Sequence, residues 1–399
     1  MNRTHFLAGS AAAISVSMVR PVLADPTQSI VLPFEPGLRE LAVYPQKRQL
    51  IVLTSRPVQL ETPHSVFDDG EFTPNDACFV RWHLPELPTR IDPAAFRIRV
   101  RGAVAQPRDF ALNELKTRFE AVEVNAVLEC AGNSRGFSSP RVPGGQWANG
   151  AMGHARWRGA RLRDVLAQVQ PQANSIQVRF QGAERPALPA TPQFAKSLTL
   201  DAANDPTVIL AYEMNGTDLP VLNGYPLRLI VPGYFGTYWV KTLNDIEVLT
   251  VPDDNYWMKT AYRVPATPNY SVTPTDSSFA TIPLTNLTVR SFLTYIADGD
   301  SLRAGTATVR GIAFDGGSGI RAVAFSSDGG STWKDAKLGP DLGRFAFRRW
   351  TATFAAEPAR KYVLAARATS SAGEGQLERW NPGGYARNAI ETATVTVNA

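Results

Sequence analysis

The sequence predicts an α+β protein in which a mixed first domain precedes an immunoglobulin-like β-sandwich. A chain of 399 residues exceeds what one hydrophobic core usually serves, so two domains are expected. Thirty glycines and thirty prolines favour many turns and a sheet-rich architecture. Beyond residue 265 the pattern changes to short strands separated by glycine-rich turns, which is typical of a sandwich.

The first domain is predicted from hydrophobic periodicity. Residues 96–101 alternate apolar and basic side chains, which predicts a half-buried strand, and apolar residues recur at helical spacing within 112–119. A further strand over 122–128 leads into a small-residue turn at 129–133, where a side chain can face a cleft. The remaining expected elements are a helix over 162–169 and strands at 176–180, 208–210, 227–231 and 239–248.

The second domain is predicted to follow a linker. Residues 264–275 contain three prolines and are expected to be extended. We therefore place the first domain at 25–265 and the sandwich at 266–399. Its expected strands lie at 308–314, 322–326, 349–354 and 362–368.

The first 24 residues are predicted to be an export signal, so the mature protein is expected in the periplasm. Arg3 supplies the positive start, 6–19 is an uncharged apolar run, and 22–24 fits the small-residue rule for cleavage. The run is too short for a membrane-spanning helix, so no membrane span is expected.

Charge excludes one class of partner. Removal of the signal removes Arg3 and Arg20 and no acid, which leaves 39 basic against 36 acidic residues and a net charge of +3. No large basic field remains to bind nucleic acid, although docking of an acidic partner is allowed.

Two cysteines, Cys78 and Cys130, allow several interpretations. An exported pair can form a disulfide. Alternatively Cys130, five positions before the cation Arg135, is a nucleophile that needs a base, or a soft thiolate ligand of a metal. The mature chain offers three candidate bases, His64, His83 and His154, and contains no haem-attachment or zinc motif.

Ordered sequence blocks resemble the sulfite oxidase family of molybdopterin enzymes, in particular the bacterial periplasmic sulfite dehydrogenases. The blocks include FVRWHLP at 79–85, LECAGNSR at 128–135 and WNPGGY at 380–385. Shorter matching blocks lie at 155–162, 211–216, 225–228, 231–233 and 240–241. The resemblance implies a molybdopterin domain of the sulfite oxidase type followed by the sandwich.

The resemblance also implies catalytic roles. Cys130 is then the thiolate ligand of molybdenum, which excludes its use in a disulfide. Arg81, Arg135 and Trp147 line the substrate pocket, where guanidinium groups suit an oxyanion. Tyr262, which lies 21 residues after Lys241, matches the active-site tyrosine better than Tyr256 does.

The cofactor is expected to be molybdenum-molybdopterin, with no haem in this chain. By the resemblance His83, Arg228 and Lys241 hold the pterin and its phosphate, and we assign Asn223 and Trp239 to the same site.

The chain departs from the animal enzymes at the anion site. Asn223 stands where they place a histidine, the loop at 138–146 lacks their lysine, and Gly383 replaces a third pocket arginine. Arg387 is our candidate to replace that arginine. The leader contains one arginine where a twin-arginine export motif has two.

The implied function is oxidation of sulfite to sulfate with transfer of electrons to a c-type cytochrome, in a homodimer formed by the second domain. One alternative is the molybdenum subunit of a sulfane dehydrogenase. The methionine sulfoxide reductase branch is disfavoured by Arg81 and the second domain. A cofactor-free periplasmic binding protein is the alternative from another class.

Metal content separates the enzyme from the binding protein. Purified from a molybdate-fed host, the enzyme should contain about one molybdenum atom per chain, because one thiolate holds one metal centre. Elemental analysis measures this ratio, and protein without molybdenum supports the binding protein.

Overall fold

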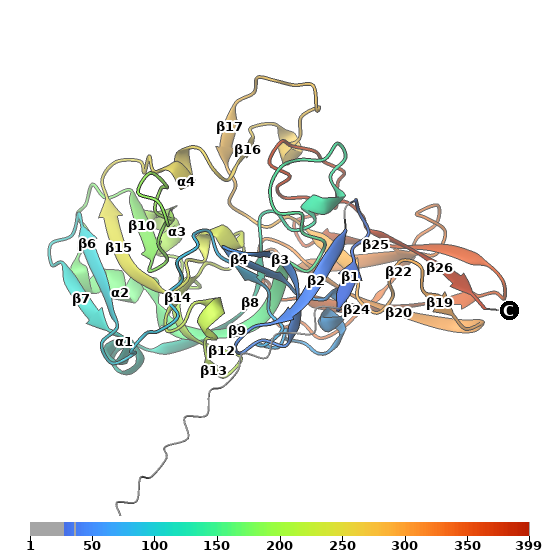
Figure 1. The fold of residues 1–399 in the computed structure, drawn as a ribbon, viewed down its shortest axis with the longest axis horizontal. Helices are drawn as coiled ribbons and strands as arrows, with labels where there is room; N and C mark the ends of the chain where they lie inside the picture. Colours follow the sequence, from blue (N-terminus) through green and yellow to red (C-terminus); the bar gives the residue numbers. More distant parts are fainter. Residues whose placement is uncertain (1–27, 36, 399) are drawn as a thin grey trace, which may run out of the picture.

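The computed structural model describes residues 28–35 and 37–398, so the predicted export signal lies outside the described residues. Sheets dominate the fold, and the described part of the chain contains short helices only. A first lobe and a set of C-terminal strands extend in opposite directions from the middle of the molecule (Figure 1).

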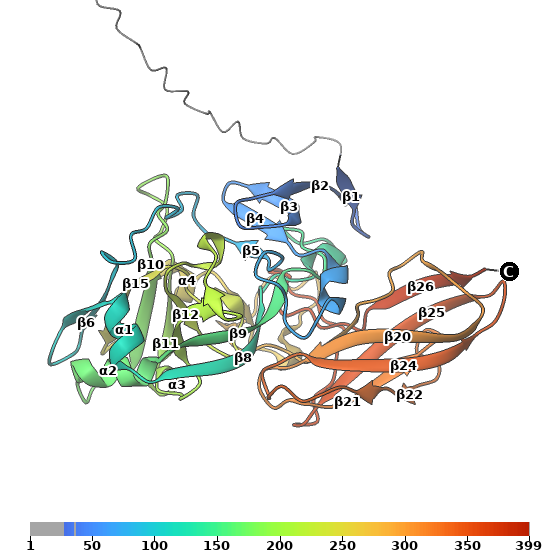
Figure 2. The same ribbon diagram turned by 90° about the horizontal axis from the view of Figure 1, so that it is seen from below.

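An antiparallel N-terminal sheet covers the junction between these two parts (Figure 2). A 3-10 turn, η1 (His64–Asp68), follows its fourth strand. The last strand delivers Arg81, and Lys47 lies in the connection between the second and third strands. The strands, in spatial order, are β1 (Ser29–Val31), β2 (Leu38–Val43), β3 (Gln49–Ser55), β4 (Val58–Glu61) and β5 (Val80–Arg81).

Two sheets build the first lobe. One has the order β11-β10-β15-β6-β7, in which β15 and β6 are parallel. Its strands are β6 (Arg97–Gly102), β7 (Arg108–Ala111), β10 (Gln177–Gly182), β11 (Ala195–Thr199) and β15 (Leu243–Leu249). The other has the order β13-β12-β9-β8, with β14 paired to β12. Its strands are β8 (Ala121–Glu129), β9 (Met152–Arg161), β12 (Ile209–Met214), β13 (Thr217–Asp218) and β14 (Arg228–Ile230).

Two helices form where the periodicity predicts them. In α2 (Leu162–Val169) the four buried side chains recur at positions i, i+3, i+4 and i+7, so one face packs into the core. In α1 (Leu112–Arg118) an acid in the first turn and bases in the last turn complement the helix dipole. Two single-turn helices, α3 (Leu200–Ala203) and α4 (Tyr256–Lys259), complete the α-helices of the described residues.

The C-terminal strands form two sheets with a shared core. One sheet has the order β18-β20-β24-β23 and the other β19-β26-β25-β21-β22. The first contains β18 (Arg290–Leu293), β20 (Gly305–Phe314), β23 (Lys337–Leu338) and β24 (Arg348–Ala356). The second contains β19 (Ser301–Leu302), β21 (Ile320–Ser326), β22 (Lys334–Asp335), β25 (Lys361–Ser370) and β26 (Thr392–Val397). The immunoglobulin-like class and the boundary at 265 stay predictions.

The four-stranded sheet is buried on both faces near the C-terminal end of β20. Val309 and Ala313 of β20 pack in the core between the two C-terminal sheets. Ile312 and Phe314 of the same strand belong to the core of the first lobe. Because side chains alternate along a strand, one face of this sheet meets its partner sheet and the other meets the first lobe.

Two expected elements differ in the structure. The strand expected at 239–248 begins only at Leu243, because 236–238 form a 3-10 turn (η4). The expected linker begins inside a hairpin, in which β16 (Arg263–Pro265) pairs with β17 (Thr281–Pro283). In the described residues no helix is long and apolar enough to cross a membrane.

An ion-pair cluster at Asp68 joins η1 to the C-terminal sheet. Its carboxylate accepts hydrogen bonds from Arg310 at 2.6 and 3.1 Å and lies 3.8 Å from Arg349. Asp68→Ala should lower the free energy of unfolding by about 2 kcal/mol, because partly buried charged hydrogen bonds are lost. Urea unfolding measures the change. Asp109→Ala, which removes an exposed pair with Arg99, is the control and should cost less than about 1 kcal/mol; equal losses would contradict the prediction.

Candidate active site

Cys130 occupies a closed turn at the end of β8. Its N–H donates to the Ala151 carbonyl at 2.9 Å, and its carbonyl accepts from the Asn133 N–H at 2.9 Å. The Asn133 side chain donates to Glu129 and accepts from the Ala151 N–H, both at 3.0 Å. A Cβ at Gly132 would lie 2.6 Å from the Arg135 guanidinium, so a larger residue there would displace that group. The turn therefore holds the thiol in one place.

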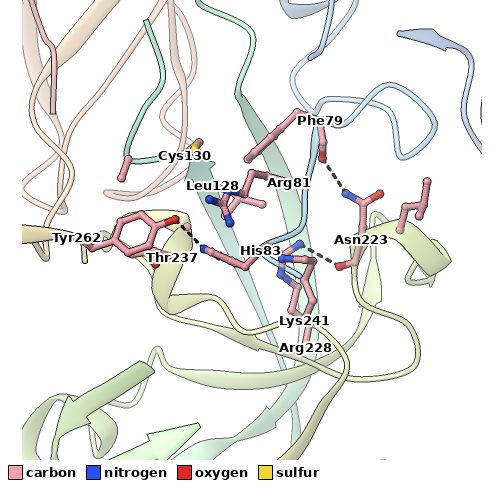
Figure 3. A pocket seen from close by; sticks show the side chains of 13 residues that line it. Phe79, Arg81, His83, Leu128, Cys130, Asn223, Arg228, Thr237, Lys241 and Tyr262 are labelled. Atoms are coloured by element: carbon pink, nitrogen blue, oxygen red, sulfur yellow. Dashed lines mark hydrogen bonds between the residues drawn. The ribbon is translucent and has the colours of Figure 1, made fainter. Parts of the chain in front are cut away.

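The structure gathers most of the predicted catalytic and cofactor residues around one cavity (Figure 3). They come from distant segments: the N-terminal sheet, the turn after β8, and the region from η3 (Val221–Asn223) to β16. The predicted residues that line the cavity are Arg81, His83, Cys130, Asn223, Arg228, Lys241 and Tyr262.

The cavity is surrounded by buried cations. Burial lowers the pKa of Lys241 to about 7 and that of Arg228 to about 10, because desolvation disfavours the charged form. Lys47 lies next to Asn223 and donates to its side-chain oxygen, and burial lowers the pKa of Lys47 to about 8. Such a cluster is costly unless an anion binds among the cations.

Unsatisfied polar atoms point to the same kind of ligand. Four buried side-chain atoms at the cavity have no hydrogen-bond partner among the described residues: Arg81 Nη1, His83 Nδ1, Arg228 Nε and Thr237 Oγ1. Because buried polar groups are normally paired, a ligand rich in acceptors is expected to complete them. A pterin with a phosphate and several heteroatoms fits this set, and Cys130 is a suitable soft ligand for its metal.

Tyr262 and His83 are coupled in this cavity. The Tyr262 hydroxyl lies 2.7 Å from His83 Nε2, and the imidazole stacks on Phe194 with centroids 3.5 Å apart. Burial lowers the pKa of His83 well below 6.5 and raises that of Tyr262. Both groups are therefore neutral at pH 7. The backbone of Tyr262 is left-handed, with φ of 56°, whereas Tyr256 is 46 % exposed and lies away from the cavity.

A second cavity adjoins the first and contains the predicted substrate residues. Arg81, Arg135, Trp147 and Tyr262 line it together with Cys130. Gly383, which the sequence marked as standing in place of a third pocket arginine, also lines it, as do Gln59 and Tyr385, which were not assigned to the site. Arg81, Cys130 and Tyr262 line both cavities, so the thiol lies where the two meet.

Glycines and a tyrosine fix the Arg135 guanidinium. Its Nε donates to the Gly383 carbonyl at 2.9 Å and its Nη1 to the Gly145 carbonyl at 3.2 Å. The guanidinium carbon lies 5.0 Å from the Tyr385 ring, and a Cβ at Gly144 would lie 2.9 Å from Nη1. Gly383 stands where the animal enzymes have a third pocket arginine. Its carbonyl here positions the guanidinium of Arg135.

Two residues that the sequence assigned to the site lie outside the lining of both cavities. Arg387 forms an ion pair with Glu391 and stacks near Phe137, and it does not line the pocket of Arg135. Trp239 is fully buried and donates to the Tyr234 carbonyl at 3.0 Å, and it lines neither cavity. Glu391 holds the Arg387 side chain, and the Tyr234 carbonyl holds that of Trp239, both away from the cavities.

Both cysteines are free thiols, so no disulfide joins them. Cys78 is buried and Cys130 is partly exposed. Lys47 donates to the Cys78 carbonyl at 2.9 Å, which ties the N-terminal sheet to the cavity wall. Glu184 accepts from the backbone N–H groups of His83 and Leu84 at 3.1 and 2.9 Å. Neither Lys47 nor Glu184 lies in a motif that the sequence made visible.

Comparison with known proteins identifies the class. A family profile described as "Oxidoreductase molybdopterin binding domain" matches residues 83–257. The structure of the sulfane dehydrogenase SoxCD from Paracoccus pantotrophus matches with a TM-score of 0.75, covering 97 % of both chains at 22 % identity. At that identity the likeness shows the fold. The chain has the fold of the molybdopterin-binding oxidoreductases.

Relatives in sequence identify the family. Mitochondrial sulfite oxidase of Homo sapiens is 35 % identical over 75 % of this chain and 56 % of its own length. Sulfite oxidase of Gallus gallus is 33 % identical over 94 % of this chain and 79 % of its own length, and that of Arabidopsis thaliana is 30 % identical over 77 % and 82 %. The chain matches little more than half of the human relative. It belongs to the sulfite oxidase family, as the sequence blocks predicted.

The lowered lysine pKa values predict how stability depends on pH in protein without cofactor. Folded Lys241 and Lys196 have pKa values of about 7 and Lys47 of about 8, against 10.5 when unfolded. Between about pH 7 and 8.5 the unfolded chain therefore binds more protons, so the free energy of unfolding should rise with pH. Glu61, with a pKa of about 7, and Cys78, with a pKa raised from 9.0, act in the opposite direction at the two edges of this window, where the three lysines outweigh them.

Urea unfolding at the two ends of this pH window measures the effect. Lys196→Met should reduce the rise, because one of the desolvated cations is removed. Stability that stays constant or falls between these pH values would contradict the prediction.

Proposed function

We propose that the protein is a molybdenum-dependent enzyme that oxidises sulfite to sulfate and passes electrons singly to a separate c-type cytochrome. The observation that carries this proposal is the position of Cys130 between the two cavities, with Arg81 and Tyr262 lining both. A metal held by the Cys130 thiolate is then within reach of a cofactor on one side and a substrate on the other.

The first cavity is assigned to the cofactor. Arg228 and Lys241 are suited to its phosphate, and His83 to the heteroatoms of its pterin. When bound, the molybdenum cofactor supplies oxygen-atom transfer to sulfur and accepts two electrons. The thiolate of Cys130 supplies the soft, electron-rich ligand that such a centre requires.

The second cavity is assigned to the substrate. Sulfite is an anion near neutral pH, and Arg81 and Arg135 offer guanidinium donors for its oxygens. Described residues accept from two of the five N–H donors of Arg135, so the group keeps donors for an anion while its orientation is fixed. Trp147, 1 % exposed, forms a rigid wall.

Tyr262 and His83 are assigned to holding and donating a proton beside the substrate. The phenol can donate at Oη toward an oxygen in the substrate cavity or keep its hydrogen bond to the neutral imidazole. Because burial raises the pKa of Tyr262, the proton stays on Oη at working pH.

The second candidate function is that of a sulfane dehydrogenase. It is favoured by Gly383, because the described lining of the substrate cavity holds two arginines and no third. Such a pocket suits a sulfur group of lower charge. Rates with sulfite and with a protein-bound persulfide as reductant decide between the two, and a preference for the persulfide would replace sulfite as substrate.

Location and assembly are part of the proposal. The predicted leader at 1–24 supports export to the periplasm, and the two C-terminal sheets are proposed to be an immunoglobulin-like module that forms a homodimer. Fractionation of the native host and light scattering after size exclusion test these two points.

The activity itself is tested with molybdenum-replete protein. Addition of sulfite should reduce cytochrome c or ferricyanide with formation of sulfate. Absence of any reduction in protein that contains stoichiometric molybdenum would overturn the proposed function.

Replacement of the proposed metal ligand is the sharpest test of the site. Cys130→Ser should remove sulfite turnover and sharply reduce bound molybdenum, because a hydroxyl is a poor substitute for a thiolate. Turnover and elemental analysis measure this in protein whose circular dichroism is unchanged. Cys78→Ala is the matched control, which should keep both metal and activity; full activity of Cys130→Ser would contradict the assignment.

A further inference from the structure

A buried arginine of the C-terminal sheet reaches the turn that carries Cys130. Arg290 begins β18, and its side chain is 1 % exposed. Phe292, two residues later, packs in the core of the first lobe, whereas Leu293 packs between the C-terminal sheets. Since residues i and i+2 share a face of a strand, register alone directs Arg290 toward the first lobe.

The Arg290 guanidinium binds both ends of the turn. Its Nη1 donates to Glu129 Oε1 at 2.8 Å, and its Nη2 donates to Ser134 Oγ at 2.7 Å. Glu129 directly precedes Cys130, and Ser134 follows it by four residues. A planar guanidinium suits this task because its donors are held in a rigid fork.

The same turn is closed internally around Cys130. Asn133 donates to the Glu129 oxygen that Arg290 also binds, at 3.0 Å. Ser134 has a left-handed backbone, with φ of 68°, and its N–H donates to the Ala148 carbonyl at 2.7 Å. A non-glycine residue in this conformation is held there by its surroundings. The hydrogen bond from Arg290 to the Ser134 hydroxyl is one of the contacts that hold it.

Docking of the two lobes does not by itself require this pair. The Phe292 and Phe314 side chains join the cores, and Arg310 of β20 already binds Asp68 of the N-terminal part. A fully buried ion pair is also a weak source of stability, because desolvation opposes the attraction. Stability therefore does not explain why Arg290 binds both ends of the turn that carries Cys130.

We propose that Arg290 is a positioning residue for Cys130: by holding Glu129 and Ser134, the C-terminal sheet sets the geometry of the metal ligand. The inference rests on the proposed role of Cys130 as ligand. It implies that the C-terminal strands are part of the active-site architecture as well as of any subunit interface.

The test compares one substitution at two interlobe ion pairs. Arg290→Lys keeps the positive charge but replaces the planar guanidinium by an ammonium group. That group lacks two donor nitrogens at a fixed spacing, so it cannot hold Glu129 and Ser134 as the guanidinium does. Arg310→Lys makes the same change at Asp68, away from Cys130, and is the matched control. If Arg290→Lys does not fold, the double variant Arg290→Gln, Glu129→Gln, which leaves no buried charge unpaired, takes its place.

The first measurement needs no metal and no turnover. In protein from a molybdate-starved host, the rate of alkylation of the Cys130 thiol by iodoacetamide reports the geometry of the turn, with buried Cys78 as internal reference. The rate should rise several-fold in Arg290→Lys and stay at the wild-type value in Arg310→Lys. Equal rates in all three proteins would overturn the proposal.

The second measurement uses molybdenum-replete protein. Arg290→Lys should lower metal retention or kcat about tenfold or more, as loss of residues that orient a metal ligand does. KM for sulfite should change by less than about twofold, because the substrate arginines are untouched. Parallel losses in Arg310→Lys would indicate a structural effect and overturn the proposal. If wild-type protein lacks molybdenum, the proposed function fails. The alkylation rates would still test the positioning role of Arg290, because they require no metal.

Discussion

Burial of positive charge around one cavity is the constraint on which the rest of the structure depends. Arg228 and Lys241 are 3 % and 7 % exposed, and Lys47 is 5 % exposed beside them. Like charges in a medium of low polarity repel, and each also loses its hydration. Only a rigid framework keeps them together before an anion binds, and the sheets of the first lobe and the N-terminal sheet provide it.

The thiol of Cys130 is placed by the same framework. Its turn is closed on the first lobe through Ala151 and on the C-terminal sheet through Arg290. The cationic cavity and the arginine pocket therefore meet at an atom that both lobes position. In the proposed function the two cavities have separate roles. The buried cations of one are assigned to the cofactor, and the other holds Arg135 in place through the carbonyls of Gly145 and Gly383.

Sequence patterns predicted the local elements well where periodicity was strong, as in α2 and β8. They placed a strand too early at Trp239, because apolar residues that pack in a 3-10 turn look like strand residues. Arg387 was assigned to the substrate pocket from its position in the chain, yet its ion pair with Glu391 directs it elsewhere. Lys47, Glu184 and Arg290 carried no motif, and a single charged residue does not reveal its partner.

The sequence by itself determined the family, the thiolate candidate and the identity of the arginines, because these depend on residue types in a recognisable order. Tertiary structure decided which of them meet. It brought Arg81 from the N-terminal sheet to Cys130, and it set Tyr385 beneath Arg135. It also turned Arg290 onto the ligand turn. These residues lie 49 to 250 positions apart in the sequence, and only packing of the sheets brings such distant segments together.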